Sequence, residues 1–135
     1  MSPLKVFVYG TLKPGECNYP RYCAGKVVEE KKAIAYGQIF HLPNFGYPAM
    51  TLGEDKVEGY LLTFANPDVI YHLDSLENYD EGRSRQKNLY DRQQIEVYDL
   101  QGRSLGFAWA YFMTTAQVTA FDGVYLPSGC WSSTK

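Results

Sequence analysis

Short runs of β-branched, aromatic and alternating apolar residues recur along the chain, and glycine, proline or polar clusters separate them. Runs of this kind between turn signals are typical of β-strands. Gly37, inside one of the runs, predicts a bulge or a close backbone approach. We expect strands over Lys5–Tyr9, Ala33–Leu42, Val57–Phe64, Gln93–Leu100 and Leu105–Met113, with a short sixth strand near Tyr47–Thr51.

The last two expected strands flank Gln101-Gly102-Arg103, which predicts a hairpin connection with a positive φ at the glycine. Phe107, Trp109 and Tyr111 alternate along the second strand of this hairpin. Alternate residues share one face of a strand, so we expect these three aromatic side chains to pack in the core.

One segment has helical spacing instead. Asn66–Asp68 opens it with a capping residue, a proline for the first helical position and an acid for the first turn. Gly82 closes the region, and a shorter helical turn is expected at Tyr19–Ala24. The apolar positions of the predicted helix are Val69, Ile70, Leu73 and Leu76.

Strands, then one clear helix, then a hairpin predict an α+β fold. We expect a small mixed, mostly antiparallel sheet, curved or barrel-like, with one main helix. The chain has 135 residues and a mass of 15.4 kDa. A chain of this size fits a single domain over residues 1–135 and can bury a core without disulfides or a structural metal.

The charges are nearly balanced, with 13 basic and 15 acidic side chains and a pI of about 5.6. Nucleic-acid-binding proteins normally have a basic excess, so we expect no nucleic-acid partner. No apolar stretch approaches the roughly 18 residues of a membrane span, and no secretory signal precedes the first strand. We therefore expect a cytoplasmic protein without a membrane partner.

Cys17, Cys23 and Cys130 form no CxxC motif, and their odd number argues against a disulfide framework. With only His41 and His72 as imidazole ligands, no zinc-binding spacing is present. We expect neither a metal nor another cofactor. Nothing in the sequence indicates an oligomeric state.

Glu77 lies inside the arc of helix surface that the apolar residues cover. Burial raises the pKa of a carboxyl group, and the negative end of the helix dipole acts in the same direction. Both effects favour a general acid/base that works near neutral pH. In the alternative interpretation the helix ends early and Glu77 is a solvated end residue. We expect Asp74, Asp80 and Glu81 to be surface acids.

The segment Tyr9–Gly15 runs from a strand into a glycine-bearing turn. Successive backbone amides in such a turn can bind a carboxylate or an oxyanion. Gly10 permits a close approach of the ligand, and Thr11 adds a hydroxyl group. Taken alone, the same residues also fit an ordinary boundary between strand and turn.

Two motifs are fairly specific: YGTL at Tyr9–Leu12 and LDxxE at Leu73–Glu77. Together with weaker matches over nearly the whole chain, and in the same order, they resemble the γ-glutamylcyclotransferase-like family in its AIG2-like, or γ-glutamylamine cyclotransferase, branch. The weaker matches are Val6–Gly15 with Asn18, Tyr47–Met50, Val57–Tyr60, Tyr90–Arg92 and Gly129–Trp131.

The resemblance implies a small barrel-like α/β fold with a pocket at one end, and a reaction that needs no cofactor. In that reaction the α-amine of a γ-glutamyl group attacks its own γ-carbonyl, which releases 5-oxoproline and an amine or amino acid. The implied partner is a small γ-glutamyl molecule. Glu77 is the implied catalytic acid/base, which moves a proton from the ammonium to the leaving nitrogen. The implied binding residues, acting through their backbone, are Tyr9, Gly10, Thr11 and Leu12.

The sequence departs from the family at Asn78-Tyr79, where many relatives have glycine and then an aromatic residue, so we expect a different pocket rim. The family's glutathione-specific branch more often has YGSL than YGTL, which makes glutathione a less expected substrate. The loop Asp80–Leu89 carries basic residues that fit either an anionic leaving group or a solvated loop. These are Arg83, Arg85 and Lys87.

Two other functions stay open. A Cys–His hydrolase would pair Cys17 or Cys23 with His41, because His72 points away from the apolar helix face. A non-catalytic module of the same fold would bind a γ-glutamyl metabolite without turning it over. The acid at Glu77 favours the enzyme, and a blocked pocket would favour the binding module.

Overall fold

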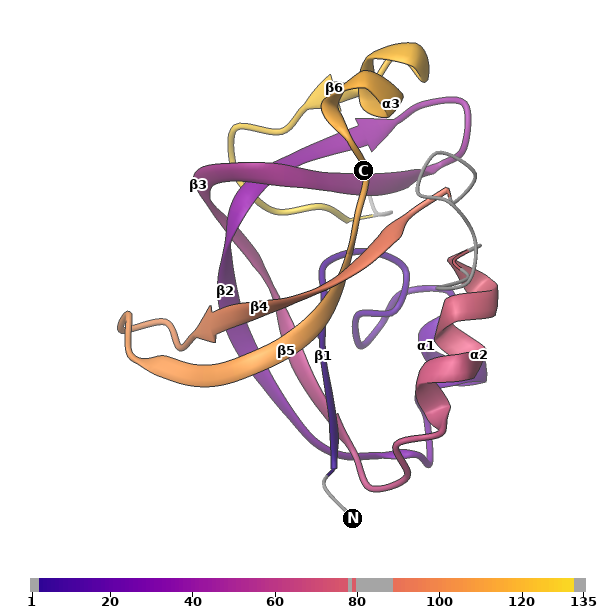
Figure 1. Ribbon diagram of the computed structural model, residues 1–135, viewed down its shortest axis with the longest axis vertical. Helices are drawn as coiled ribbons and strands as arrows, with labels where there is room; N and C mark the ends of the chain where they lie inside the picture. The colour runs from indigo at the N-terminus through magenta and orange to yellow at the C-terminus, as the bar shows by residue number, and fades with distance from the viewer. Residues whose placement is uncertain (1–2, 78, 80–88, 133–135) are drawn as a thin grey trace.

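The computed structural model of the protein describes residues 3–77, 79 and 89–132. Figure 1 shows a strongly curved sheet with α2 along one side, and α1 lies next to α2. The described elements are β1 (Leu4–Val8), α1 (Tyr19–Tyr22), β2 (Val27–Leu42), β3 (Tyr47–Phe64), α2 (Val69–Leu76), β4 (Asp91–Tyr98), β5 (Ser104–Phe112), α3 (Thr115–Ala120) and β6 (Val124–Tyr125).

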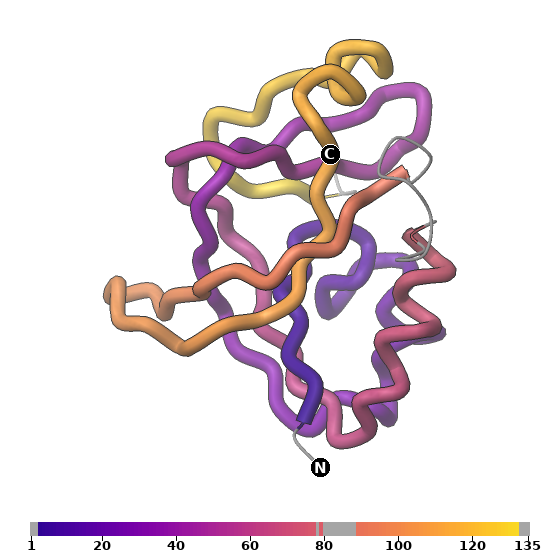
Figure 2. Tube along the Cα trace, viewed as in Figure 1, coloured from indigo at the N-terminus to yellow at the C-terminus, as the bar shows by residue number. Residues whose placement is uncertain are grey.

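The sheet closes on itself. Its strand order is β3-β1-β5-β4-β2-β6, and an additional pairing of β2 with β3 joins the first five strands of that order into a barrel (Figure 2). β1 and β5 run parallel, paired at Val6 and Trp109, and the other pairings are antiparallel. The predicted α+β fold with a mostly antiparallel, barrel-like sheet is confirmed, and α2 is the longest of the described helices.

β2 and β3 form one long hairpin whose register shifts between Gly37 and Gln38. Gly37 pairs with Asp55, whereas Gln38 pairs with Thr51. A Cβ atom on Gly37 would lie 2.6 Å from the main-chain oxygen of Thr51, so a larger residue does not fit. The predicted bulge is confirmed. The separate strand expected at Tyr47–Thr51 is instead the first part of β3, because β2 continues as its partner past the bulge.

β1 is buried on both faces and separates two cores. Phe7 belongs to the core inside the barrel, to which all five barrel strands contribute. Val6 and Val8 belong to the core between the barrel and α2. β1 ends at Val8, directly before the turn that is predicted to bind an anion.

α2 begins after Asp68 and not at Pro67. The reason is local: the side-chain oxygen of Asn66 accepts a 2.9 Å hydrogen bond from the Asp68 amide and forms a turn before the helix. The helix ends early enough that Glu77 is its C-cap residue. The residues of α2 that are buried against the outer core are Val69, Ile70 and Leu73.

The strand patterns do not predict α3 or β6. α3 begins with a capping box: the Thr114 hydroxyl accepts from the Gln117 amide at 3.1 Å, and the Gln117 side chain accepts from the Thr114 amide at 2.9 Å. This T-x-x-Q spacing is the sequence signal that would have located the helix. No helix within the described ranges has the length and apolar character that a membrane span requires.

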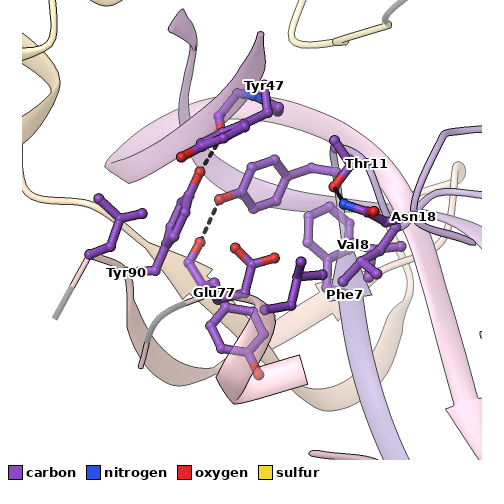
Figure 3. Close-up of a pocket in the computed structure, with 14 residues that line it drawn as sticks. Phe7, Val8, Thr11, Asn18, Tyr47, Glu77 and Tyr90 are labelled. Carbon is purple, nitrogen blue, oxygen red and sulfur yellow. Dashed lines mark hydrogen bonds between the residues drawn. The ribbon is translucent and has the colours of Figure 1, made fainter. Parts of the chain in front are cut away.

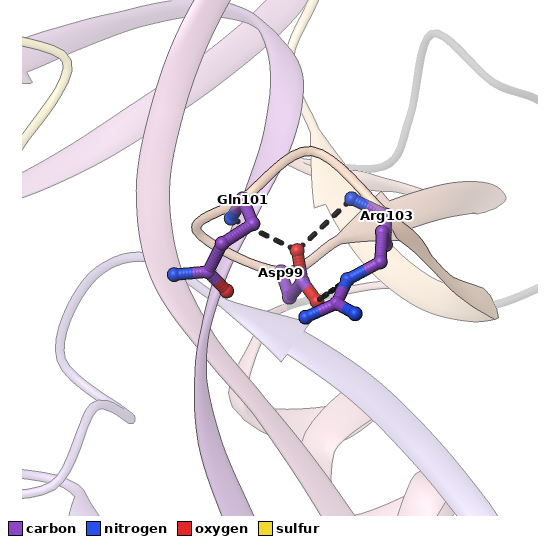
Figure 4. A network of polar contacts seen from close by, with 3 residues as sticks. All are labelled: Asp99, Gln101 and Arg103. Atoms are coloured by element: carbon purple, nitrogen blue, oxygen red, sulfur yellow. Dashed lines mark hydrogen bonds and ion pairs between the residues drawn. The ribbon is translucent and has the colours of Figure 1, made fainter.

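The β4–β5 hairpin extends away from the barrel (Figure 1). Asp99 holds its turn, accepting from the amides of Gln101 and Arg103 at 2.9 Å each (Figure 4), and Gly102 has the expected positive φ of 87°. The prediction that Phe107 packs in the core is wrong. Its side chain is 60% exposed, whereas the neighbouring Ala108, on the other face of β5, is buried in the core inside the barrel.

Candidate active site

A small pocket of about 100 Å³ opens where β1 ends beside the C-terminal end of α2 (Figure 3). It also receives residues from the start of β3, from the segment before β4 and from β5. Its lining consists of Phe7, Val8, Tyr9, Gly10, Thr11, Leu12, Asn18, Tyr47, Pro48, Leu76, Glu77, Leu89, Tyr90 and Tyr111. The structure thus brings every residue of the predicted site around one cavity.

The Tyr9–Leu12 turn is fixed by short-range hydrogen bonds. The amide of Lys13 donates to the Gly10 oxygen at 3.0 Å, and the amide of Asn18 donates to the Thr11 oxygen at 2.9 Å. The Asn18 side chain also donates to the Thr11 hydroxyl at 2.9 Å. Among the described residues, no backbone hydrogen bond of this loop uses the amides of Gly10, Thr11 or Leu12 as donors. These amides are therefore available to an anion or a carbonyl oxygen in the pocket.

Two buried tyrosine hydroxyls, those of Tyr9 and Tyr90, fix the walls of the pocket, and Tyr90 is labelled in Figure 3. Tyr9 donates to the main-chain oxygen of Tyr111 at 2.6 Å and accepts from the Met50 amide at 3.3 Å. Tyr90 donates to the main-chain oxygen of Pro48 at 2.6 Å. Burial raises the pKa of both phenols, and the nearby Glu77 carboxylate raises them further. The phenols are therefore neutral donors that shape the cavity.

Among the described residues that line this pocket, Glu77 is the only charged one. Its amide closes the helix by donating to the Leu73 oxygen at 2.9 Å, while its carboxylate points into the cavity (Figure 3). The residue keeps part of its surface exposed at the pocket mouth. Burial nevertheless raises the pKa of Glu77 from 4.5 to about 8. No described residue offers its carboxylate a hydrogen bond or an ion pair that would offset this loss of hydration.

The expectation that Asp74 is a surface acid is wrong. Its carboxylate forms a 3.1 Å ion pair with Arg92 and accepts a 2.7 Å hydrogen bond from the Tyr111 hydroxyl. Helical periodicity placed Asp74 at the edge of the apolar arc, but the arginine that pairs with it comes from β4 and is distant in sequence. The other two expected surface acids, Asp80 and Glu81, lie outside the described residues.

Several pocket residues were missed as functional candidates. Tyr47 and Tyr90 lay in segments that resemble the family, but the sequence assigned them no role, and Tyr111 was expected only in the core. The proposed rim residue Asn78, the helix stop Gly82 and the basic residues of the loop before Leu89 lie outside the described part of the chain. Their predicted roles stay predictions.

The structure does not assemble a Cys–His pair. Within the described residues, no cysteine lines the pocket. Cys23 is fully buried, and burial raises the pKa of its thiol to about 11, which disfavours the nucleophilic thiolate. His41 Nδ1 accepts a 3.0 Å hydrogen bond from the Trp131 indole. In the same ranges, no cluster of metal-ligating side chains is found.

Residues 6–133 match the family model described as gamma-glutamyl cyclotransferase, AIG2-like. The chain belongs to this family. A curated relative from Niallia circulans, gamma-L-glutamyl-butirosin B gamma-glutamyl cyclotransferase, is 32% identical over 106 residues. The match covers 78% of this chain and 65% of the relative, so the chain spans less than two thirds of that protein.

Two solved structures share the fold. An AIG2-like protein from Mus musculus superposes with a TM-score of 0.77 and 18% identity, over 100% of this chain and 92% of that chain. YkqA from Bacillus subtilis gives a TM-score of 0.67 and 23% identity, over 96% of this chain and 40% of YkqA. At these identities the structural similarity establishes the fold alone.

Proposed function

We propose that this member of the family is a γ-glutamylcyclotransferase, which converts a γ-glutamyl amine or a γ-glutamyl amino acid into 5-oxoproline and the free amine or amino acid. The observation that carries the proposal is the carboxylate of Glu77, which shares one small pocket with the amides of the Tyr9–Leu12 turn. The name of the Niallia circulans relative supports the same reaction class.

The proposed reaction is an intramolecular acyl transfer. Glu77 takes a proton from the α-ammonium of the γ-glutamyl group, and the free amine nitrogen then attacks the γ-carbonyl carbon. The new carbon–nitrogen bond closes the five-membered lactam, and the bond from the γ-carbon to the leaving nitrogen breaks. Glu77 returns its proton to that nitrogen. The attacking nitrogen loses a second proton as it becomes the lactam N–H, and this proton passes to the leaving nitrogen in the same way, so the amine departs as an ammonium and the enzyme ends in its starting protonation state.

The geometry fits the demands of this reaction. The nucleophile and the electrophile belong to one substrate molecule. The enzyme therefore needs only to hold the substrate in a bent conformation in which its α-amine lies close to its γ-carbonyl. A cavity of about 100 Å³ has room for a small group, which leaves the departing amine at the mouth. The amides of the turn are suited to stabilise the developing oxyanion, at roughly 3 kcal/mol for each donor.

The raised pKa of Glu77 suits a carboxylate that exchanges a proton with an ammonium group. An ordinary glutamate is a weak base toward an ammonium, because its pKa lies several units lower. With a pKa of about 8, Glu77 is better matched to this proton transfer. A positioned acid/base of this kind contributes typically 10²–10⁴-fold to the rate.

The test is a mass-spectrometric assay for 5-oxoproline after incubation with a panel of γ-glutamyl amines, γ-glutamyl amino acids and glutathione. We expect release from at least one panel member and loss of that activity in Glu77→Gln. Glu54→Gln, which alters an exposed acid on β3, is the matched control and should keep full activity. Turnover by Glu77→Gln at the parental rate would remove the assigned role.

The same panel distinguishes the non-catalytic alternative. Binding measured by calorimetry without any 5-oxoproline, for every compound in the panel, would identify a γ-glutamyl-binding module in place of an enzyme.

A further inference from the structure

Lys13 is a buried cation that the proposed mechanism does not use. It directly follows the Tyr9–Leu12 turn, and only 7% of its surface is exposed. A lysine normally keeps its ammonium group in water, because burial of a charge costs free energy. Among the described residues, no carboxylate lies within ion-pair distance of this ammonium. Within the same residues, a salt bridge therefore does not account for the burial of Lys13.

The side chain of Lys13 connects the turn to the far end of the chain. Its ammonium donates a hydrogen bond to the main-chain oxygen of Trp131, 118 positions later. The backbone of Lys13 also closes the turn, because its amide donates to the Gly10 oxygen at 3.0 Å and its oxygen accepts from the Glu16 amide at 2.9 Å. One residue thus fixes the turn internally and joins it to residues 126–132, the C-terminal segment.

The C-terminal segment is held against two strands of the barrel. The Leu126 amide donates to the main-chain oxygen of Ile39 on β2 at 2.9 Å. The Gly129 oxygen accepts from the Glu58 amide on β3 at 2.8 Å. A Cβ atom on Gly129 would lie 2.1 Å from the main-chain oxygen of Lys56, so the segment lies directly on β3. Its backbone is therefore fixed before it reaches Trp131.

Trp131 anchors the segment in the core inside the barrel. Its side chain is buried there, and its indole N–H donates to His41 Nδ1 at 3.0 Å. The indole and imidazole rings are also stacked, with centroids 6.5 Å apart. The oxygen that Lys13 binds thus belongs to a residue with a well-defined position. The segment Gly129–Trp131 is one of the weaker family matches, to which the sequence assigned no role.

We propose that Lys13 is a positioning residue for the reaction, which holds the turn that binds the γ-glutamyl group at a fixed place relative to the C-terminal segment. This inference rests on the proposed function. Lys13 does not line the pocket, so it is assigned no contact with substrate. A charged donor forms a stronger hydrogen bond to a carbonyl oxygen than a neutral donor does, and the direction of the bond restricts where the turn can lie.

Lys13→Met tests the role, because methionine fills a similar space but cannot donate. The turn amides are proposed to act on the developing oxyanion, so their displacement should lower kcat at least about fivefold and change KM less. The melting temperature should stay within about 4 °C of the parent, since loss of one hydrogen bond is offset by removal of a buried charge. A merely structural role would instead lower the melting temperature and leave kcat of the folded protein unchanged.

A second substitution tests the connection to the C-terminal segment. Trp131→Phe keeps an aromatic ring in the core but removes the hydrogen bond to His41, so it loosens the residue that Lys13 binds. We expect kcat to fall about threefold or more. Once Lys13→Met has broken the connection, the change at Trp131 should have no further effect on kcat, and the double variant should match Lys13→Met.

Two further variants complete the set. Lys13→Arg keeps a charged donor, so its kcat should exceed that of Lys13→Met. Lys32→Met removes an exposed lysine from β2 and is the matched control, which should keep the parental kcat, KM and melting temperature. The measurements are steady-state rates of 5-oxoproline release, taken well below the melting temperature of each variant, together with thermal unfolding.

The outcomes separate this inference from the proposed function. Parental kcat in Lys13→Met, with Glu77→Gln inactive, would overturn the positioning role and leave the proposed reaction intact. Losses of kcat that multiply in the double variant would overturn it too, because the segment would then not act through Lys13. If Lys13→Met does not fold, parental kcat in Trp131→Phe overturns the inference. A parent that releases no 5-oxoproline from any compound of the panel would instead overturn the proposed function, and this inference with it.

Discussion

Tyr9 donates a 2.6 Å hydrogen bond from its hydroxyl to the main-chain oxygen of Tyr111, a residue 102 positions later in the chain. The bond joins the end of β1 to the parallel strand β5, where β1 and β5 are paired by ladder contacts only at Val6 and Trp109. The same hydroxyl accepts from the Met50 amide on β3. One buried phenol therefore fixes the mutual position of three strands at the edge of the pocket.

Replacement of this phenol by phenylalanine should destabilise the fold. Tyr9→Phe leaves a buried carbonyl and a buried amide without this partner, which costs about 1–3 kcal/mol of unfolding free energy. Denaturant unfolding followed by circular dichroism measures the loss. Tyr71→Phe, at a tyrosine that is 63% exposed on α2, is the matched control and should change the stability by less than about 0.5 kcal/mol. Equal stabilities for both variants would contradict the role of the bond.

The activity should depend on pH through the ionisation of Glu77. Because burial raises its pKa to about 8, the basic form is a small fraction at pH 6 and predominates only above 8. We expect kcat/KM for 5-oxoproline release to rise about tenfold per pH unit below 8 and to level off above it. Rates measured from pH 6 to 9.5 test this. A profile that is flat between pH 6 and 8 would show that no group with this pKa controls the reaction.

The same carboxyl group should weaken the fold at alkaline pH. The folded-state pKa of about 8 lies above the ordinary value of 4.5, so the favourable contribution of the protonated form is complete below 4.5 and is lost as the pH rises through 8. At pH 9 the free energy of unfolding of Glu77→Gln should therefore exceed that of the parent by about 1–3 kcal/mol. This difference is smaller than the full pKa shift implies, because water in the open pocket partly solvates the carboxylate. At pH 4 the two proteins should be nearly equal. A variant that is less stable at pH 9 would contradict this sign.

Local patterns in the sequence predicted much of the site, and long-range contacts account for what was missed. Glu77 could be predicted because helical periodicity places it beside the apolar residues of one short helix. The turn at Gly10 could be predicted because a strand and a glycine adjoin in the sequence. The two features share a pocket only because the barrel closes, and no local pattern encodes that closure.

Asp74 is a second residue whose surroundings could not be predicted from local sequence patterns. On a helical wheel Asp74 is a boundary residue, and nothing nearby in sequence distinguishes it from a solvated acid. Arg92 and Tyr111 reach it from β4 and β5 after the chain has folded. Phe107 was misassigned for a related reason: alternation identifies the face of a strand but not whether that stretch of the strand has a neighbour to cover it.

The cysteines should be dispensable for activity. Cys17 and Cys130 are exposed, and Cys23 is buried without lining the pocket. Cys17→Ser with Cys130→Ser should keep the parental kcat and stability. Cys23→Ala should keep kcat but lose about 1 kcal/mol of unfolding free energy, since it removes a buried sulfur atom. A specific loss of turnover in one of these variants, with the fold intact by circular dichroism, would revive a thiol mechanism.

Gly10 should be required because its α-carbon lies against Pro48. A Cβ atom at this position would lie 2.7 Å from Cγ and 2.9 Å from Cδ of the proline ring, and Pro48 is held in place by the hydrogen bond from Tyr90. Gly10→Ala must therefore displace the turn that lines the same pocket as Glu77. A displacement of a few tenths of an ångström or more disturbs a near-attack geometry, so kcat/KM should fall at least about tenfold. Pro48→Ala removes both ring atoms from the contact, and Gly10→Ala/Pro48→Ala should recover part of the activity. A double variant as impaired as Gly10→Ala alone would show that this contact does not set the position of the turn.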